Sequence, residues 1–410
     1  MKKKIYWSLA IILLPLLAGL ACRFTAADPT ATPVVMVEPQ PTEETEALPT
    51  EAPTETIITE ATEEPVPPTQ EGAFQDLVQL EKSLWIQDEG MVFVAFFFQN
   101  PNTNILFEDV EYTVFLYGPN GEEIDSDTSY VRWIFPEQTF GITFNFYLAD
   151  ETVSVDSVTV DWVYEGTATA DGFTNPFVTQ NIQYWENNNF PMVTGKIDNQ
   201  NTETYTDIRT NIICYNAAGE IVGGGYTYID FIPGQDYMGF ASYIDAFGEV
   251  ASVEVFPTFS YNTIYYDAPD LWSVISVQDS YFYPGDYGDI LGGALIKNET
   301  SSVLRSSILY ATFYDEAGNV TSAGSSRIGI LLPGAALGVS PWVLSPPDGT
   351  NPTVEFDVLV LPGEVEDDYE LTENPFVVNT ATLTGEYNNY VLVNFTNTYS
   401  KQASDVDVYV

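Results

Sequence analysis

In the stretch ATFYDEAGNV, residues 311–320, the apolar residues Ala311 and Phe313 alternate with Thr312 and Tyr314, and a turn that contains glycine follows. Two close variants stand earlier in the chain, IICYNAAGEIV from Ile212 and VFLYGPNGEEI from Val114. Alternation with period two is typical of a strand with one buried face, and Asn, Asp and Gly are typical of the turn that follows such a strand. The threefold recurrence indicates that the chain is built from repeats.

An asparagine marks the same place in four successive units. These asparagines follow one another at intervals of 99 residues, and a turn glycine and a later proline keep nearly the same spacing. A unit of this length with several short strands and no helical periodicity predicts an antiparallel β-sandwich of the immunoglobulin-like kind, so an all-β chain is expected. The landmarks are Asn100, Asn199, Asn298 and Asn397; Gly121, Gly219 and Gly318; and Pro136, Pro233 and Pro333.

The alternation also predicts which side chains face each core. In the strand before the asparagine, the inward sets are Val94, Phe96 and Phe98; Val193, Gly195 and Ile197; Gly292, Ala294 and Ile296; and Val391, Val393 and Phe395. In the next strand, they are Tyr112, Val114 and Leu116; Thr210, Ile212 and Cys214; and Leu309, Ala311 and Phe313.

Cys214 occupies the position that Leu116 and Phe313 fill in the other units, so we expect a buried apolar thiol rather than a nucleophile. Phe93 and Phe97 point to the opposite face of their strand. They either form a binding patch or pack between units or sheets, and packing is the favoured interpretation. The strand-ending residues Tyr117, Tyr215 and Tyr314 are expected at the sandwich rim with their hydroxyls in water.

The N-terminus, MKKKIYWSLAIILLPLLAGLAC, has a basic start, an apolar run from Ile5 to Leu17 and small residues before a cysteine, which is the layout of an export signal. It resembles bacterial lipoprotein signals, whose lipobox ends in a small residue followed by the cysteine that is lipidated. Here the sequence Gly19-Leu20-Ala21-Cys22 matches, except that Leu is commonest where Gly19 stands. The resemblance implies a signal peptide over residues 1–21, a lipid on Cys22, and attachment to a bacterial membrane.

Residue 23 is Arg rather than the Asp that retains many such lipoproteins at an inner membrane, so the cell surface or outer membrane is the expected location. An uncleaved N-terminal anchor, or a plain secretory signal in which Cys22 is incidental, is the alternative. Residues 22–73 are rich in Thr, Pro and Glu, with no Lys or Arg between Arg23 and Lys82. Such a segment buries too little apolar surface to offset chain entropy, so a disordered tether is expected.

The phrase Ala311-Thr312-Phe313-Tyr314-Asp315 followed by Gly318 resembles the FxLYD domain, a bacterial β-sandwich module often found in exported proteins. The resemblance extends over about residues 76–410, and it implies no catalytic residues. Ala and Phe stand in the Phe and Leu positions, and the earlier copies keep less of the phrase. The expected domains are β-sandwiches over residues 74–170, 171–268 and 269–364, and part of a fourth over residues 375–410, for which a truncated chain is favoured over two strands docked on the third unit.

Composition excludes several kinds of chemistry. The chain has 59 Asp and Glu against 12 Lys and Arg, a net charge of −47, which disfavours nucleic acid as a partner. Histidine is absent, so catalytic relays and metal sites that need imidazole are excluded. Carboxylate catalysis and calcium remain, because neither needs histidine.

The carboxylate candidates are better interpreted as solvated loop acids: none of the catalytic candidates recurs at the matching position of the other units, and neither calcium loop has the full twelve-residue pattern. For catalysis these are Glu108, Asp109 and Glu111, or Asp286 and Asp289. For calcium they are the loops at Asp125 and Glu366 and the junction acids Asp267, Asp270, Glu366, Asp367 and Asp368. The triplet Gly223-Gly224-Gly225 precedes no helix, so a bulge or a close backbone contact is expected there rather than a phosphate loop.

The sequence thus predicts a membrane-anchored extracytoplasmic lipoprotein that presents non-catalytic β-sandwich repeats for binding, adhesion or spacing at the cell surface. No catalytic, cofactor or metal residue is predicted, and calcium is the disfavoured alternative. The membrane, through the lipid on Cys22, is the first expected partner, and an extracellular protein or glycan is the second. The alternative function is that of a secreted carboxylate-dependent polysaccharide hydrolase.

Overall fold

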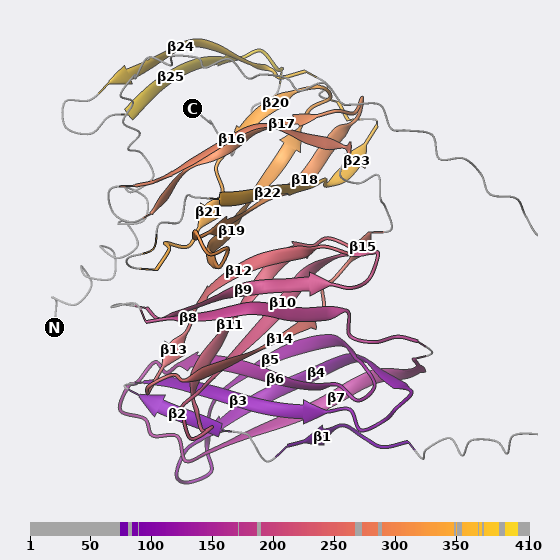
Figure 1. The fold of residues 1–410 in the computed structure, drawn as a ribbon, viewed down its shortest axis with the longest axis vertical. Helices are drawn as coiled ribbons and strands as arrows, with labels where there is room; N and C mark the ends of the chain where they lie inside the picture. The colour runs from indigo at the N-terminus through magenta and orange to yellow at the C-terminus, as the bar shows by residue number, and fades with distance from the viewer. Residues whose placement is uncertain are drawn as a thin grey trace, which may run out of the picture. The chain divides into compact units, whose positions relative to one another are not determined.

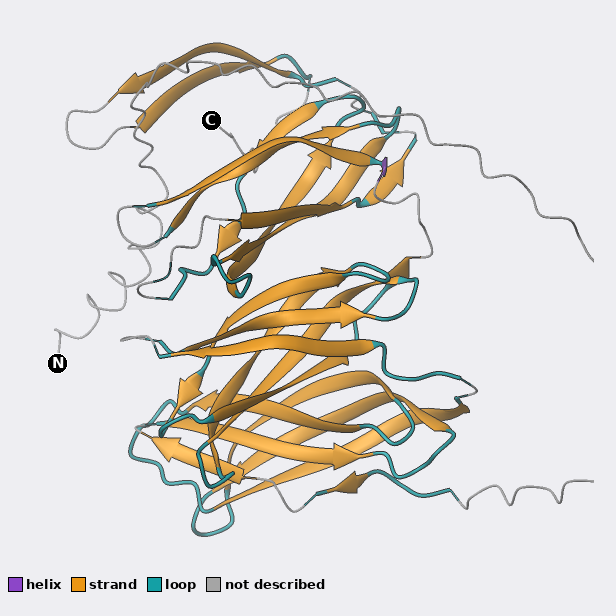
Figure 2. Ribbon diagram, in the orientation of Figure 1, coloured by secondary structure: helices purple, strands orange, loops and turns teal. Residues whose placement is uncertain are grey.

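The computed structural model describes residues 74–80, 84–88, 90–170, 172–186, 190–266, 273–285, 289–347, 350, 355–367, 369–370, 373–384 and 390–400. Within these ranges the regular elements are the strands β1 to β25, apart from a short helical turn at Ser273, and all strand pairings are antiparallel, so the predicted all-β class is confirmed (Figure 2). The signal sequence and the tether lie outside the described residues. The described strands before Pro375 belong to one compact unit, and β24 and β25 belong to another.

The first sandwich pairs two sheets around one core. Sheet 1A is centred on β3, which pairs with β1 and β2 along one edge and with β6 along the other. Sheet 1B has β4 between β5 and β7. The strands are β1 (Val78–Gln79), β2 (Leu84–Asp88), β3 (Met91–Gln99), β4 (Ile105–Tyr117), β5 (Glu123–Ile134), β6 (Thr139–Tyr147) and β7 (Ser157–Thr169).

The second and third sandwiches repeat this plan. Sheets 2A and 3A are centred on β9 and β17, and sheets 2B and 3B on β10 and β18. Sheet 2A comprises β8 (Phe177–Trp185), β9 (Met192–Asn199) and β12 (Tyr237–Tyr243); sheet 2B comprises β10 (Thr204–Tyr215), β11 (Ile221–Ile232), β13 (Asp245–Ala246), β14 (Ser252–Phe259) and β15 (Tyr265–Tyr266). Sheet 3A comprises β16 (Ile275–Pro284), β17 (Ile290–Asn298) and β20 (Ala336–Val339); sheet 3B comprises β18 (Val303–Tyr314), β19 (Val320–Leu331), β21 (Trp342–Val343), β22 (Glu355–Leu361) and β23 (Glu364–Glu366).

The predicted inward side chains of the three sandwiches lie in their cores. Val94, Phe96 and Phe98 of β3 pack with Val114 and Leu116 of β4 in the first core. Their counterparts from β9 and β10, and from β17 and β18, are buried in the same way, except Gly292, which is half-buried. Alternation with period two therefore located these faces correctly, because successive side chains of a strand point to opposite sides of its sheet.

The repeated asparagine ties the turn before the long central strand to the far end of the neighbouring strand. The side-chain amide of Asn100 donates to the carbonyl oxygens of Ile105, at 2.7 Å, and Phe135, at 2.9 Å, while its Oδ1 accepts from the Asn102 N–H at 3.0 Å. Asn298 makes the matching bonds to the carbonyls of Ser302, Leu331 and Leu332. Both side chains are fully buried. The 99-residue interval thus reflects one hydrogen-bonding role that recurs in each sandwich.

The outer face of sheet 1A is covered by the outer face of sheet 2B (Figure 1). Phe93, Ala95 and Phe97 of β3 are buried there against Ile213 and Tyr215 of β10. Phe97 meets the ring of Phe256 at 5.8 Å between centroids, edge to face. The interpretation that Phe93 and Phe97 pack between units is confirmed, and no binding patch is formed by them.

The second and third sandwiches meet in the same way, sheet 2A against sheet 3B. The Tyr310 hydroxyl donates to the Gly239 carbonyl at 2.9 Å, and the Thr194 hydroxyl donates to the Val320 carbonyl at 2.6 Å. Close approach is needed at Gly239, where an added Cβ would lie 2.2 Å from Cγ2 of Thr312. Consecutive sandwiches therefore stack sheet face on sheet face within one compact unit.

The expectation that the strand-ending tyrosines hold their hydroxyls in water is wrong for Tyr215 and Tyr314. Both rings are buried at the junctions, and their hydroxyls donate to Glu254 and Asp357, each at 2.7 Å. The two carboxylates occupy equivalent places, each across from the residue two positions before its tyrosine. The expectation placed these rings at an exposed sandwich rim, whereas a neighbouring sandwich covers both of them.

The second compact unit contains the hairpin of β24 (Phe376–Thr384) and β25 (Tyr390–Asn397). Phe395 packs on Phe376 with ring centroids 5.4 Å apart, yet it remains 38% exposed, and Val391 and Val393 are only partly buried. The predicted buried face is thus half-exposed, since the described residues of this unit include no second sheet. Residues 401–410 lie outside the described part of the chain.

Candidate functional site

Of the two cysteines, Cys214 lies among the described residues and Cys22, the predicted lipidation site, lies outside them. Cys214 is a fully buried free thiol in the second core, and burial raises its pKa to about 12. A thiol with that pKa stays protonated at neutral pH and is a poor nucleophile. The interpretation of Cys214 as an apolar core residue is confirmed.

The candidate catalytic carboxylates were interpreted as solvated loop acids, and for three of them the loop position is wrong. Glu108, Asp109 and Glu111 lie on β4, where Asp109 has a positive φ of 49° and marks an irregularity in the strand. A hydrogen bond from the Tyr130 hydroxyl to Glu111 raises the pKa of Tyr130. Asp289 is partly buried before β17, while Asp286 lies outside the described residues. A catalytic role for these acids therefore stays a hypothesis.

The acids considered for calcium have local partners of their own. Asp125 accepts from the Ser126 N–H at 2.8 Å, Glu366 pairs with Arg305 at 2.7 Å, and Asp367 accepts from the Ser302 hydroxyl at 2.5 Å. Asp267, Asp270 and Asp368 lie outside the described residues. In the part of the chain that the structure describes, no three Asp, Glu or Cys side chains are grouped so as to hold a metal ion.

The glycine triplet lies on β11, beside a register shift between Cys214 and Tyr215. A Cβ at Gly224 would lie 2.1 Å from the Ile212 carbonyl oxygen and 3.1 Å from the ring of Phe93. The predicted bulge and close backbone contact are confirmed. The glycines let the first sandwich approach the second, which is a structural role.

A buried arginine at the first junction was not predicted from the sequence. Arg209 of β10 is only 3% exposed, and its Nη2 donates to the Thr143 carbonyl of β6 at 2.7 Å. Its Nη1 donates to the hydroxyls of Ser129, at 2.9 Å, and Tyr228, at 3.4 Å. The guanidinium also lies 3.9 Å from the ring centroid of Tyr226, in cation–π geometry. Arg209 thus connects its own strand β10 to β11 of the same sandwich and to β5 and β6 of the first sandwich. It makes no ion pair with any described carboxylate.

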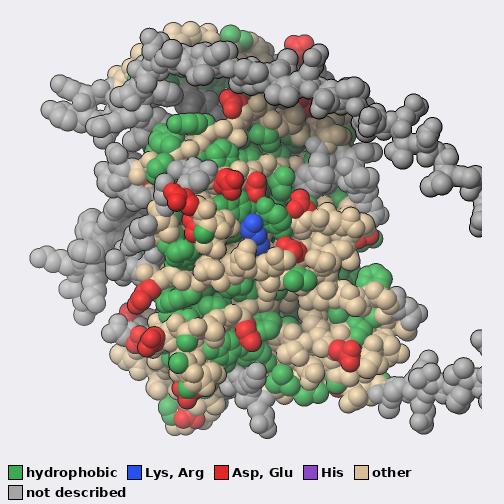
Figure 3. All heavy atoms as spheres, in the orientation of Figure 1, with side chains coloured by type: hydrophobic (Ala, Val, Ile, Leu, Met, Phe, Trp, Pro, Cys, Tyr) green, Lys and Arg blue, Asp and Glu red, His purple; other side chains and the backbone are tan. Residues whose placement is uncertain are grey.

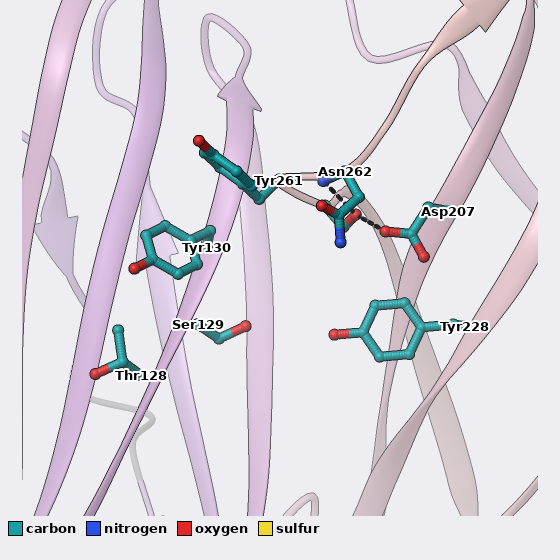
Figure 4. Close-up of a pocket in the computed structure, with 8 residues that line it drawn as sticks. Thr128, Ser129, Tyr130, Asp207, Tyr228, Tyr261 and Asn262 are labelled. Atoms are coloured by element: carbon teal, nitrogen blue, oxygen red, sulfur yellow. Dashed lines mark hydrogen bonds between the residues drawn. The ribbon is translucent and has the colours of Figure 1, made fainter.

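A cleft of about 310 Å³ opens to solvent beside Arg209. One side is formed by β5 of the first sandwich, and the other by β10, β11 and the turn between β14 and β15 of the second (Figure 4). Tyr130 of the first sandwich and Tyr261 of the second meet with ring centroids 5.3 Å apart, and the hydroxyls of Ser129 and Tyr228 point toward each other across the cleft. The lining residues are Thr128, Ser129, Tyr130, Asp207, Tyr228, Ser260, Tyr261 and Asn262.

Hydrogen bonds hold the turn that carries Tyr261 in place. The Ser260 hydroxyl donates to Asp207, and the Thr263 hydroxyl donates to the Asp207 carbonyl at 3.2 Å. From the other sandwich, the Arg132 guanidinium donates to the Thr263 carbonyl. The cleft is therefore fixed by bonds to both sandwiches, and its shape depends on their junction.

The second junction has a smaller cleft of about 160 Å³. Its polar centre is Asp357, which accepts from the hydroxyls of Tyr314, at 2.7 Å, and Tyr237, at 3.1 Å. Lys196 lies over both rings, 4.2 Å from the centroid of Tyr237 and 4.6 Å from that of Tyr314. Burial and the hydrogen bonds to Tyr237 and Asp357 raise the pKa of Tyr314. The polar groups named here contact one another, so we interpret the cluster as a contact that holds the two sandwiches together.

On the face shown in Figure 3, several acidic side chains surround a basic one, and other acids are scattered among polar and apolar groups. Comparison with protein-family models finds no match for the chain, and comparison with curated proteins finds none either. The resemblances to lipoprotein signals and to the FxLYD domain therefore stay predictions. Among the residues that the structure describes, no helix is both long and apolar enough to cross a bilayer.

Proposed function

We propose that the chain is a bacterial surface lipoprotein that holds a stack of β-sandwiches away from the membrane and presents their outer surfaces without catalysing a reaction. In this proposal the lipid on Cys22 anchors the protein, and residues 22–73 form the tether between the membrane and the stack. One thioether-linked diacylglycerol and one N-acyl chain would suffice for stable attachment, since each buried methylene contributes about 0.8 kcal/mol.

The observation that carries the proposal is the burial of the outer sheet faces at both junctions. Sandwiches joined only by linkers reorient freely, whereas packed apolar faces hold neighbours in one orientation. Phe93 and Phe97 at the first junction, and Tyr310 and Tyr314 at the second, are buried by these contacts. A body of this kind is suited to spacing and to presenting surfaces at fixed distances.

The chemistry of the described residues also supports a non-enzymatic role. The protein has no histidine, and its described cysteine is a buried thiol whose pKa is raised to about 12. Asp357 and Glu254 are engaged as hydrogen-bond acceptors of buried tyrosines, which suits adhesion between sheets. These groups stabilise the junctions, and none is presented to a substrate.

Replacing Cys22 by alanine is expected to abolish incorporation of an alkyne-labelled fatty acid and to release the protein from the membrane fraction. Detergent phase partition of wild type and variant measures the second effect. Cys214→Ala is the matched control, because it removes the other thiol and leaves the predicted lipidation site intact. A Cys22→Ala variant that still carries the label, or that still partitions with membranes, would contradict the anchor.

A further inference from the structure

The Tyr261 cleft, defined by its eight lining residues, has the composition of a ligand site. Its volume of about 310 Å³ lies at the lower end of the range for small-ligand pockets, about 300–1,000 Å³. Three tyrosine rings line it, and all are solvent-exposed, with Tyr261 62% exposed. Exposed tyrosine rings offer flat apolar faces with a polar edge.

The floor of the cleft supplies oriented hydrogen-bond donors. Nη1 of Arg209 donates to Ser129 and Tyr228, so each hydroxyl oxygen already accepts one bond. A hydroxyl that accepts from a cation keeps its own proton to donate elsewhere, and both of these hydroxyls point into the cleft (Figure 4). On the same side as Tyr228, Asp207 and Asn262 add acceptors and an amide donor.

We propose that this cleft binds a neutral oligosaccharide. A pyranose ring has a flat C–H face that can stack on Tyr261 or Tyr130, and hydroxyls around its edge that both donate and accept. The Ser129 and Tyr228 hydroxyls donate to its oxygens, and Asp207 accepts from its hydroxyls. The cleft exists only where sandwiches 1 and 2 meet, so the junction itself creates the site.

The charges of the cleft favour an uncharged ligand. Arg209 lies directly behind the floor hydroxyls and repels a cation, although three tyrosines alone would suit a quaternary ammonium group. Asp207 within the cleft, and the net charge of −47, repel an anion. A neutral saccharide meets neither penalty, and it uses the donors and acceptors on both sides.

The test is a titration of the full chain, in zwitterionic detergent micelles that keep it dissolved with or without lipid, with cellohexaose, chitohexaose, mannohexaose and maltohexaose. Saturation-transfer NMR detects contact, and calorimetry gives the Kd. Tetramethylammonium chloride and oligogalacturonate form the cationic and anionic arms. At least one neutral hexasaccharide is expected to bind with a Kd of about 1 mM or tighter, and neither charged probe is expected to bind at the cleft.

Tyr261→Ala is expected to weaken that binding at least about 10-fold, because a stacking ring is lost. Ser129→Ala, which removes a floor hydroxyl without removing a ring, is expected to weaken it about 5-fold or more. Tyr281→Ala is the matched control, since Tyr281 is 70% exposed on β16 and lies outside the cleft. This variant should bind the hexasaccharide with the affinity of wild type.

Three results would overturn the proposal: no binding of any neutral hexasaccharide, wild-type affinity in both cleft variants, or binding of a charged probe alone at the cleft. The titration is independent of the anchor proposed above, because binding is measured whether or not Cys22 carries lipid. Release of reducing ends from a hexasaccharide bound at the cleft would support this ligand class and would contradict the non-enzymatic role. The failures of the two proposals are thereby distinguishable.

Discussion

Replacing Phe97 by alanine is expected to lower the free energy of unfolding of the stacked sandwiches by about 3–5 kcal/mol. Phe97 points away from the core of its own sandwich, yet it is only 2% exposed, because sheet 2B covers it. Its ring meets Phe256 edge to face. Truncation would remove this contact and leave a cavity between two sheets, and neighbouring backbone can fill such a cavity only in part.

Chemical denaturation of the full chain, followed by tryptophan fluorescence, measures the loss as a shift of the midpoint. Phe173→Ala is the matched control, because Phe173 is 58% exposed and its removal should change stability by no more than about 0.5 kcal/mol. If the two variants unfolded at the same denaturant concentration, the sandwiches would not be packed through this face.

Replacing Asn298 by aspartate is expected to cost about 2–5 kcal/mol at neutral pH. The Asn298 amide donates to three carbonyl oxygens within 3.1 Å. An ionised carboxylate has no proton to donate, so it would face these oxygens as a buried, uncompensated charge. The three carbonyls would also lose their donor.

This loss should depend on pH in a defined direction. Burial and the surrounding carbonyls would raise the pKa of the introduced carboxyl above its unfolded value of about 3.9. Because the folded pKa is raised, the variant binds a proton more tightly when folded, and its stability relative to wild type recovers as pH falls through that raised pKa. Denaturation midpoints at pH 8 and pH 5 measure the recovery.

Asn120→Asp is the matched control, since Asn120 lies in an exposed turn and should show neither the loss nor the recovery. A wild-type midpoint for Asn298→Asp at pH 8 would contradict the role assigned to the repeated asparagine. A loss that is equal at pH 8 and pH 5 would contradict its electrostatic cause.

The repeats and the inward face of each strand were predictable, because both depend on local pattern. Alternation with period two assigns Val114 and Leu116 to one side of β4 whatever the strand packs against. The position of Cys214 in the core followed from the same register. The 99-residue interval located Asn100 and its counterparts, but their role depends on carbonyls more than thirty residues further along the chain, which spacing alone does not reveal.

The junctions were predictable only in part. Phe97 points outward from its sheet and was expected to pack between units. The strand-ending tyrosines were instead expected to hold their hydroxyls in water. What decides between these outcomes is which sheet covers the face, and that depends on how one sandwich docks on the next. Burial of Tyr215 and Tyr314 follows from this docking.

The cleft was not predicted, because its residues come from four segments of two sandwiches. Tyr226 and Tyr228 do stand at alternate positions of one strand, so their shared face was visible in the sequence. Nothing in the sequence indicated that β5 of the preceding sandwich would lie opposite them. Arg209 was missed for the same reason, since its partners Ser129 and Thr143 belong to the other sandwich.

Sheet-face packing between sandwiches creates both the junctions and the cleft, and a disulfide across the second junction tests this packing most directly. With cysteines at positions 239 and 312, in a chain that also carries Cys22→Ala, the two Cβ atoms would lie 3.2 Å apart. Disulfides span about 3.5–4.5 Å between Cβ atoms, so a small backbone shift is enough for closure. Peptide mapping without reduction identifies the bond.

The 239–312 disulfide is expected to form in nearly all molecules on air oxidation. A chain with cysteines at 338 and 312 is the control and should form none, because a Cβ at Gly338 has no described atom within 4 Å. If both thiols of the 239–312 pair instead remained open to alkylation in the folded chain, sheets 2A and 3B would not be in contact and the stacked arrangement would be wrong.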